Sequence, residues 1–246
     1  MSNVLLTERD TGLFYDCYNY GALSISQIRK KHFPNCGKAT ALNRLSKLKK
    51  EGYLRSQRIG IVIYQGMPQK IGAVYQLTRQ ALQYLKVRFP NDRFKEDPLA
   101  LNTSALSHDL LLTEVVGALK QRFPDKTIIR GEFFSGSDGT KRIPDAVILD
   151  PSQKANVAIE LELTAKSNER YRDIVLQYRL SRDFEKVLYI TQDSGIQEKI
   201  KRQIIQGKAN VHLPNLSTGK FYFVHLHDLL RDPHAATISN GTTQFE

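Results

Sequence analysis

Three acidic residues on two neighbouring apolar segments have the types and spacing for metal-ion chemistry. Asp145 lies in the apolar segment 143–150, and Glu160 and Glu162 lie in the segment 158–166. Apolar and polar residues alternate in the second segment, which is the period of a half-buried strand and places both glutamates on one face. A turn-rich linker joins the segments, so antiparallel pairing would bring Asp145 beside the glutamates. The sequence therefore predicts a hairpin that carries three carboxylates at one place.

Such a cluster favours a divalent-metal site. Two glutamates at positions i and i+2 repel each other on one face unless a cation or a base neutralises them, and Asp145 would add a third charge. We therefore prefer a metal site to a solvent-facing strand edge. Ligation by oxygen alone predicts Mg²⁺ or Mn²⁺, which act on phosphate esters by activating water and neutralising developing charge. Lys166 shares the parity of Glu162 if the strand continues, and would add a positive charge to this face.

The distribution of charge divides the chain of 246 residues, whose net charge is +11. Residues 1–95 hold 17 Lys and Arg against 5 Asp and Glu, whereas residues 96–246 hold 19 against 20. A basic first part and a nearly neutral second part predict a nucleic-acid-binding module joined to another domain. We expect a first domain at 1–95, a second at 96–231 and a flexible tail, rich in small and polar residues, at 232–246.

The first part has the element order of a winged helix-turn-helix. Caps and apolar spacing predict helices from Thr7 to near Gly21, from 25 to 32 and from 38 to 50, followed by strands at 55–65 and 73–77. The third helix would be the recognition helix, with Leu42, Leu45 and Leu48 inside. A solvated helix face is the alternative. The residues expected to contact DNA are polar and face outward on the helix and ribbon: Lys38, Thr40, Asn43, Arg44, Lys47, Arg58 and Lys70.

The second part alternates between helical and strand patterns. The sequence predicts helices near 102–123, 168–182 and 195–206, and strands at 127–134, 143–150, 156–164, 186–191 and 220–226. The fold class expected for the whole chain is therefore α/β, in its α+β form. His108 lies on the first of these helices, where it would be a general base or a phosphate contact, with a capped or core histidine as an equal alternative.

The hairpin residues resemble the motif of the PD-(D/E)xK nucleases, which have the restriction-endonuclease-like fold: Pro144-Asp145 is followed by Glu160-x-Glu162. The resemblance implies a mixed sheet flanked by helices, with Asp145 and Glu160 as metal ligands. In that motif the third position is commonly lysine and helps to polarise the attacking water. This chain has Glu162 there; some members of the fold are similar in using a second glutamate, and Lys166 would supply the missing charge.

The two parts together resemble the replication-relaxation family, and within it the plasmid mobilisation relaxases of the MOBC type. The resemblance covers the winged helix, His108 in Leu-Ser-His-Asp-Leu, Pro144-Asp145 and Glu-Leu-Glu-Leu-Thr-Ala-Lys-Ser. It implies a metal-dependent endonuclease that nicks DNA at a transfer origin. The partners expected are double-stranded or single-stranded DNA and other mobilisation or replication proteins. One alternative is a non-catalytic DNA-binding accessory protein with a degenerate nuclease fold, and another is a transposase-type endonuclease subunit.

Composition predicts the cellular compartment in which the protein works. Two cysteines, Cys17 and Cys36, are too few for a disulfide framework or a zinc site built from cysteine. The sequence has no signal-peptide pattern and no apolar run long enough to cross a membrane, so we expect a soluble, cytoplasmic protein.

The DNA target, the strand preference and the oligomeric state stay open. A metal-held carboxylate cluster favours water as the nucleophile, against the tyrosines Tyr15, Tyr18, Tyr20, Tyr171 and Tyr178.

Overall fold

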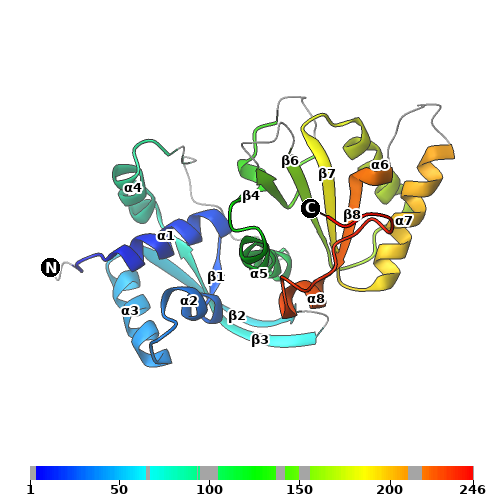
Figure 1. Ribbon diagram of the computed structural model, residues 1–246. Coiled ribbons are helices and arrows are strands. Elements are labelled where there is room, and N and C mark those ends of the chain that lie inside the picture. The colour runs from blue at the N-terminus through cyan, green and yellow to red at the C-terminus, as the bar shows by residue number, and fades with distance from the viewer. Residues whose placement is uncertain are drawn as a thin grey trace. The chain divides into compact units, whose positions relative to one another are not determined.

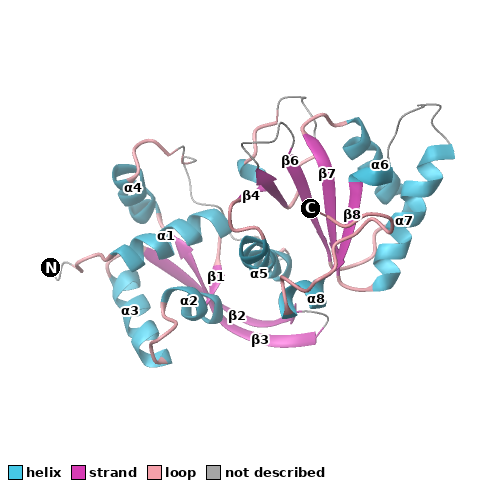
Figure 2. Ribbon diagram, in the orientation of Figure 1, coloured by secondary structure: helices cyan, strands magenta, loops and turns pink. Residues whose placement is uncertain are grey.

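The computed structural model describes residues 4–64, 67–92, 94, 105–136, 142–149, 156–209 and 218–245. These residues form a mixed α/β protein with two sheets (Figure 1 and Figure 2). It divides into two compact units, Met1–Thr113 and Glu114–Glu246. The division falls inside α5 (Leu106–Arg122) rather than at the predicted boundary after residue 95. The start of α5 belongs to the first unit because Leu106 and Leu110 pack in a buried cluster with Ala22 and Val74.

The first unit contains the three predicted helices and the predicted ribbon. Its elements are α1 (Glu8–Tyr20), β1 (Leu23–Ser24), α2 (Ile25–His32), α3 (Lys38–Lys50), β2 (Leu54–Tyr64), β3 (Met67–Leu77) and α4 (Arg79–Arg88). Thr7 and Ser24 begin α1 and α2 as capping boxes, in which a side-chain oxygen accepts a backbone N–H of the first turn. The strands form an antiparallel sheet in the order β1-β3-β2, with Arg58 opposite Ala73.

The buried face of α3 differs by one position from the prediction. Ala41, Leu45 and Leu48 are fully buried, whereas Leu42 is 39% exposed. The spacing of i, i+4 and i+7 places the three buried residues on one stripe. Leu42 lies beside that stripe, so the correct inner set begins at Ala41.

The second unit is built on one five-stranded sheet. After α5 come β4 (Thr127–Arg130), the 3-10 helix η1 (Gly131–Phe133), β5 (Ala146–Leu149), β6 (Asn156–Glu162), α6 (Asn168–Leu180), β7 (Phe184–Thr191), α7 (Ser194–Ala209), η2 (Thr218–Lys220), β8 (Phe221–His225) and α8 (Leu226–Arg231). The strand order is β4-β5-β6-β7-β8. β4, β5 and β6 pair antiparallel, and β6, β7 and β8 pair parallel. Parallel neighbours need crossover helices, and α6 and α7 are those helices.

One face of this sheet forms a core with α6 and α7. Val147, Ala158, Val187 and Tyr189 from the strands pack in one buried cluster with residues of both helices, Tyr171, Ile174, Val175, Tyr178, Ile196, Ile200 and Ile204. Figure 1 shows α6 and α7 beside the parallel strands. Every second residue of a strand therefore faces this core. Glu160 and Glu162 follow Ala158 in this alternation, so they lie on the same face of the sheet as Ala158.

The segment from Asp232 to Phe245 is packed on the sheet, so the prediction of a flexible tail from residue 232 is wrong for this part. Ser239 exchanges two backbone hydrogen bonds with Phe223, at 2.9 and 3.2 Å. The ring of Phe245 meets that of Tyr222 edge to face, with centroids 5.0 Å apart. β8 is the last strand of the sheet, and pairing with this segment covers its open edge. Glu246 lies outside the described residues.

Among the described residues, no helix has both the length and the apolar character needed to cross a membrane.

Candidate active site

Asp145 is held by β6 and by the first residue of η1, just before β5 begins. Its N–H donates to the carbonyl of Ile159 at 3.0 Å, and its carbonyl accepts the N–H of Gly131 at 3.1 Å. Its carboxylate oxygen Oδ2 accepts the backbone N–H of Leu161 at 2.7 Å. A Cβ on Gly131 would lie 1.7 Å from the carbonyl oxygen of Pro144. Glycine at 131 is therefore what lets η1 approach the Pro144-Asp145 segment and fix the position of this carboxylate.

Glu160 lies inside the protein and is held by a guanidinium and a phenol. Glu160 is 1% exposed. Arg142 donates from Nε to Oε1 at 3.0 Å and from Nη2 to Oε2 at 2.6 Å, a bidentate pairing. The hydroxyl of Tyr178, whose residue is fully buried, also donates to Oε1. Both carboxylate oxygens of Glu160 therefore have donors.

Glu162, at the end of β6, also lies beside a cation and a phenol. It is 1% exposed, and the Nζ of Lys166 donates to its Oε1. The hydroxyl of Tyr171 lies 3.5 Å from its Oε2 and also accepts the backbone N–H of Lys166 at 3.2 Å. β6 ends at Glu162, so Lys166 reaches this carboxylate from the turn after the strand. The predicted proximity of Lys166 and Glu162 is present, although the strand does not continue to Lys166.

Burial and mutual repulsion raise the pKa of both glutamates. The pKa of Glu160 is raised to about 7, first by burial and then by the charge of Asp145, against the opposing effect of Arg142. The pKa of Glu162 is raised by burial, which Lys166 opposes and Asp145 reinforces. The charge of Asp145 thus acts on both glutamates. A cation at this place would relieve the repulsion.

The donor set suits a hard divalent ion, and the present contacts show what such an ion would replace. Carboxylate oxygens are the ligands of Mg²⁺ and Mn²⁺. Within the described parts of the chain, no group of three or more His, Cys, Asp or Glu residues is arranged as ligands around a point. Arg142 and Lys166 bind the glutamate oxygens that a metal would use. The acids therefore have the ligand chemistry of such an ion, while in this structure Arg142 and Lys166 hold the oxygens that it would bind.

Several residues of the cluster were not predicted for this role. Arg142 is not among the predicted site residues, and Tyr171 and Tyr178 were considered as alternative nucleophiles. The seven-residue spacing of the two tyrosines indicates a shared helical face, and that face carries the hydroxyls that meet the glutamates. The position of Arg142, three residues before Asp145, has no periodicity that would have revealed it.

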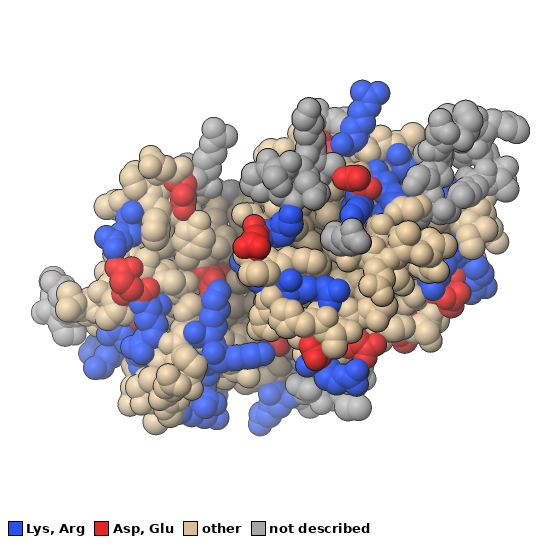
Figure 3. Space-filling view, in the orientation of Figure 1, with Lys and Arg blue, Asp and Glu red and all other residues tan. Residues whose placement is uncertain are grey.

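Most of the expected DNA-contacting residues are exposed on the first unit. Lys38, Thr40, Asn43 and Lys47 lie on the open side of α3, and Arg58 and Lys70 lie on β2 and β3. Figure 3 shows Lys and Arg side chains gathered over the part of the molecule that α2 and α3 occupy. His108 also belongs to this unit, on α5, with its Nδ1 3.6 Å from Asp109 Oδ1. His108 and the three carboxylates therefore belong to different units.

Arg44 differs from the other residues of this set because its guanidinium points into the protein. Its Nε donates to Asp10 Oδ1 at 3.0 Å, and its Nη2 donates to Asp10 Oδ2 and to the carbonyl of Leu5 at 2.8 Å. The side chain of Asp10 is 0% exposed and that of Arg44 is 18% exposed. Arg44 therefore joins α3 to α1, and the prediction that it faces outward is wrong.

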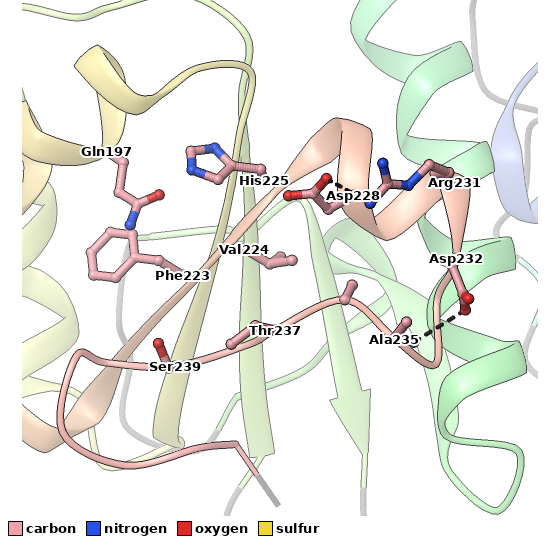
Figure 4. Close-up of a pocket in the computed structure, with 11 residues that line it drawn as sticks. Gln197, Phe223, Val224, His225, Asp228, Arg231, Asp232, Ala235, Thr237 and Ser239 are labelled. Carbon is pink, nitrogen blue, oxygen red and sulfur yellow. Dashed lines mark hydrogen bonds and ion pairs between the residues drawn. The ribbon is translucent and has the colours of Figure 1, made fainter.

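A polar pocket of about 340 Å³ lies at the end of β8 (Figure 4). Its lining includes Gln197, His225, Asp228, Arg231 and Ser239. His225 is in register with Thr191 on β7, which is in register with Glu162 on β6. The pocket therefore lies at the carboxyl end of β8, on the same edge of the parallel strands as Glu162 at the end of β6, and ligands bind at this edge in open α/β sheets.

No protein-family model, curated protein or solved structure matches the chain.

Proposed function

We propose that this protein is a divalent-metal-dependent DNA endonuclease that nicks one strand, as a plasmid mobilisation relaxase does at a transfer origin. The observation that carries the proposal is that the Asp145 carboxylate binds the backbone of Leu161, between Glu160 and Glu162, while Lys166 pairs with Glu162. Three carboxylates with a lysine beside them are the side chains that metal-assisted phosphodiester cleavage requires. The DNA would be double-stranded or locally single-stranded, and other mobilisation or replication proteins are its proposed partners.

The architecture of each unit supports this assignment. An antiparallel β5–β6 pair followed by α6 and a parallel β7 is the arrangement expected of a restriction-endonuclease-like domain. Helices α1, α2 and α3 followed by the β2–β3 ribbon are the elements expected of a winged helix-turn-helix. The open side of α3, with Lys38, Thr40, Asn43 and Lys47, would contact DNA in this proposal.

Each acid then has a role. Asp145 and Glu160 would hold Mg²⁺ or Mn²⁺, which makes water more nucleophilic and neutralises charge on the phosphate. Glu162 would complete the ligand set or orient the water, and Lys166 would stabilise the charge that builds up on the phosphate oxygens. The water oxygen bonds to phosphorus while the bond from phosphorus to the leaving deoxyribose oxygen breaks. One water proton passes to a carboxylate, and the leaving oxygen takes up a proton from solvent.

A non-catalytic accessory protein is the second candidate, and one observation favours it. Arg142 and Lys166 already neutralise the two buried glutamates as closed ion pairs. Such pairs can serve as a fixed part of a folded scaffold without any metal. The two candidates differ in whether these carboxylates cut DNA.

The test compares the wild type with Asp145→Asn in a supercoiled-plasmid nicking assay with Mg²⁺ or Mn²⁺. Asparagine removes the charge but keeps an oxygen that can accept the Leu161 N–H, so the hairpin should stay folded. Asp173→Asn changes an exposed acid on α6 and is the matched control. We expect nicking by the wild type and the control, loss of nicking in Asp145→Asn, and equal duplex binding by all three. Duplex binding without nicking by the wild type would favour the accessory protein.

A further inference from the structure

Two buried hydroxyls on β7 face the acid cluster without a hydrogen-bond partner. Tyr189 and Thr191 are both 0% exposed. Within the described part of the chain, neither the Tyr189 hydroxyl nor the Thr191 Oγ1 has a donor or acceptor in reach. A buried polar group without a partner is unfavourable and uncommon in folded proteins. A pair of them at one place therefore calls for a functional explanation.

Their register puts them beside the two glutamates. β6 and β7 are parallel, with Glu160 in register with Tyr189 and Glu162 in register with Thr191. Residues in register on parallel strands lie on the same face, with backbones about 4.8 Å apart. The pKa of Tyr189 is raised well above its usual value, first by burial and then by the charges of Glu160 and Glu162. This hydroxyl therefore lies within the field of both carboxylates.

The two cations of the cluster lie nearer the solvent than the carboxylates that they bind. The side chains of Arg142 and Lys166 are 21% and 23% exposed, whereas those of the glutamates that they bind are 2% exposed. The hydroxyls of Tyr189 and Thr191 lie in the buried interior. An ion that arrives from solvent would meet the two cations first and would have to take the carboxylate oxygens from them.

We propose that Tyr189 and Thr191 are positioning residues that hold Glu160 and Glu162 when a divalent cation replaces Arg142 and Lys166. In this exchange each hydroxyl donates to a carboxylate oxygen and keeps the glutamate oriented toward the ion. Arg142 and Lys166, released from the glutamates, become available to a DNA phosphate. Donors behind a ligating carboxylate are a general requirement of metal sites. The inference deepens the proposed function and rests on it.

Packing alone does not account for either hydroxyl. The ring of Tyr189 stacks on those of Phe223 and Phe221, with centroids 5.6 and 6.3 Å apart, and phenylalanine would preserve both contacts. Valine has the same β-branched shape as threonine and would fill the space of Thr191. A role limited to the core therefore needs neither oxygen, whereas carboxylate positioning needs both.

The experiment measures Mn²⁺ binding to the full chain by electron paramagnetic resonance, with thermal unfolding of the metal-free protein in parallel. Tyr189→Phe and Thr191→Val should each weaken Mn²⁺ binding by roughly 10-fold or more, while Thr191→Ser, which keeps the hydroxyl, stays near the wild type. The metal-free variants should unfold at or above the wild-type midpoint, because each loses an unpaired buried hydroxyl. Tyr222→Phe, a buried tyrosine on β8, is the control and should bind Mn²⁺ as the wild type does.

Two results would overturn the inference while leaving the proposed function intact. One is wild-type Mn²⁺ affinity in both Tyr189→Phe and Thr191→Val. The other is a fall in the unfolding midpoint of the metal-free variants, which would show that the hydroxyls stabilise the fold. A wild type that binds no Mn²⁺, with or without DNA, would instead refute the metal site of the proposed function, and this inference with it.

Discussion

Replacing Arg44 with alanine should destabilise the protein much more than replacing any exposed cation of the same helix. Asp10 is fully buried, and two guanidinium nitrogens of Arg44 donate to its carboxylate. Burial would raise the pKa of Asp10, but hydrogen bonds from Arg44 and Thr7 lower it below its usual value. Removing one partner of a buried ion pair costs about 3–5 kcal/mol. Thr7 still donates to Asp10 after the change, so we expect about 2–3 kcal/mol here.

Urea denaturation followed by circular dichroism measures this loss directly. Lys47→Ala on the exposed side of α3 is the control and should change the free energy of unfolding by no more than about 0.5 kcal/mol. The cost of Arg44→Ala should shrink as the pH falls through the lowered pKa of Asp10, because a protonated carboxyl no longer needs the guanidinium. Equal unfolding free energies for Arg44→Ala and Lys47→Ala at pH 7 would refute a structural role for Arg44.

Three further predictions concern the nucleophile, the buried glutamate and the DNA interface. Tyr171→Phe and Tyr178→Phe should still nick, and denaturing gels should show no protein–DNA adduct, since burial raises the pKa of both phenols and makes them poor nucleophiles. The raised pKa of Glu160 means that its stabilising contribution is present below its ordinary value of 4.5 and is lost as the pH rises through about 7. Relative to Glu160→Gln, the wild type should therefore lose up to about 3 kcal/mol of unfolding free energy across that range, and a pH-independent difference would contradict this. Lys38→Ala and Lys47→Ala should each reduce the slope of log binding constant against log salt by about 1, and unchanged slopes would place the DNA elsewhere.

Local signals in the sequence predicted most of the elements. The capping residues Thr7 and Ser24 and the apolar spacing after them gave the correct starts of α1 and α2. The alternation in the second hairpin segment predicted β6 and the shared face of its glutamates. The pairing of the segment Asp232–Phe245 with β8 was missed because its composition is that of a loop, and only the neighbouring sheet edge reveals its role.

The hairpin that carries Asp145, Glu160 and Glu162 is local in sequence, so strand parity was sufficient to predict that they share a face. The groups that bind Glu160 were not predicted, because Arg142 lies before the hairpin and Tyr178 lies on α6. Tyr189 and Thr191 on β7 are in register with Glu160 and Glu162, and that register joins two parallel strands separated by a helix. Arg44 was misplaced for a similar reason, since its partner Asp10 lies on another helix. Contacts between distant segments carry no periodic signal within either one.

The most direct test of the central claim is the rate of supercoiled-plasmid nicking while Mn²⁺ is titrated into the metal-free wild-type protein. If Asp145, Glu160 and Glu162 form a catalytic metal site, the rate should rise from background to saturation with Mn²⁺ and return to background with a chelator. A rate that is the same with and without Mn²⁺, or that stays at background at every concentration on plasmid that the protein binds, would contradict the claim.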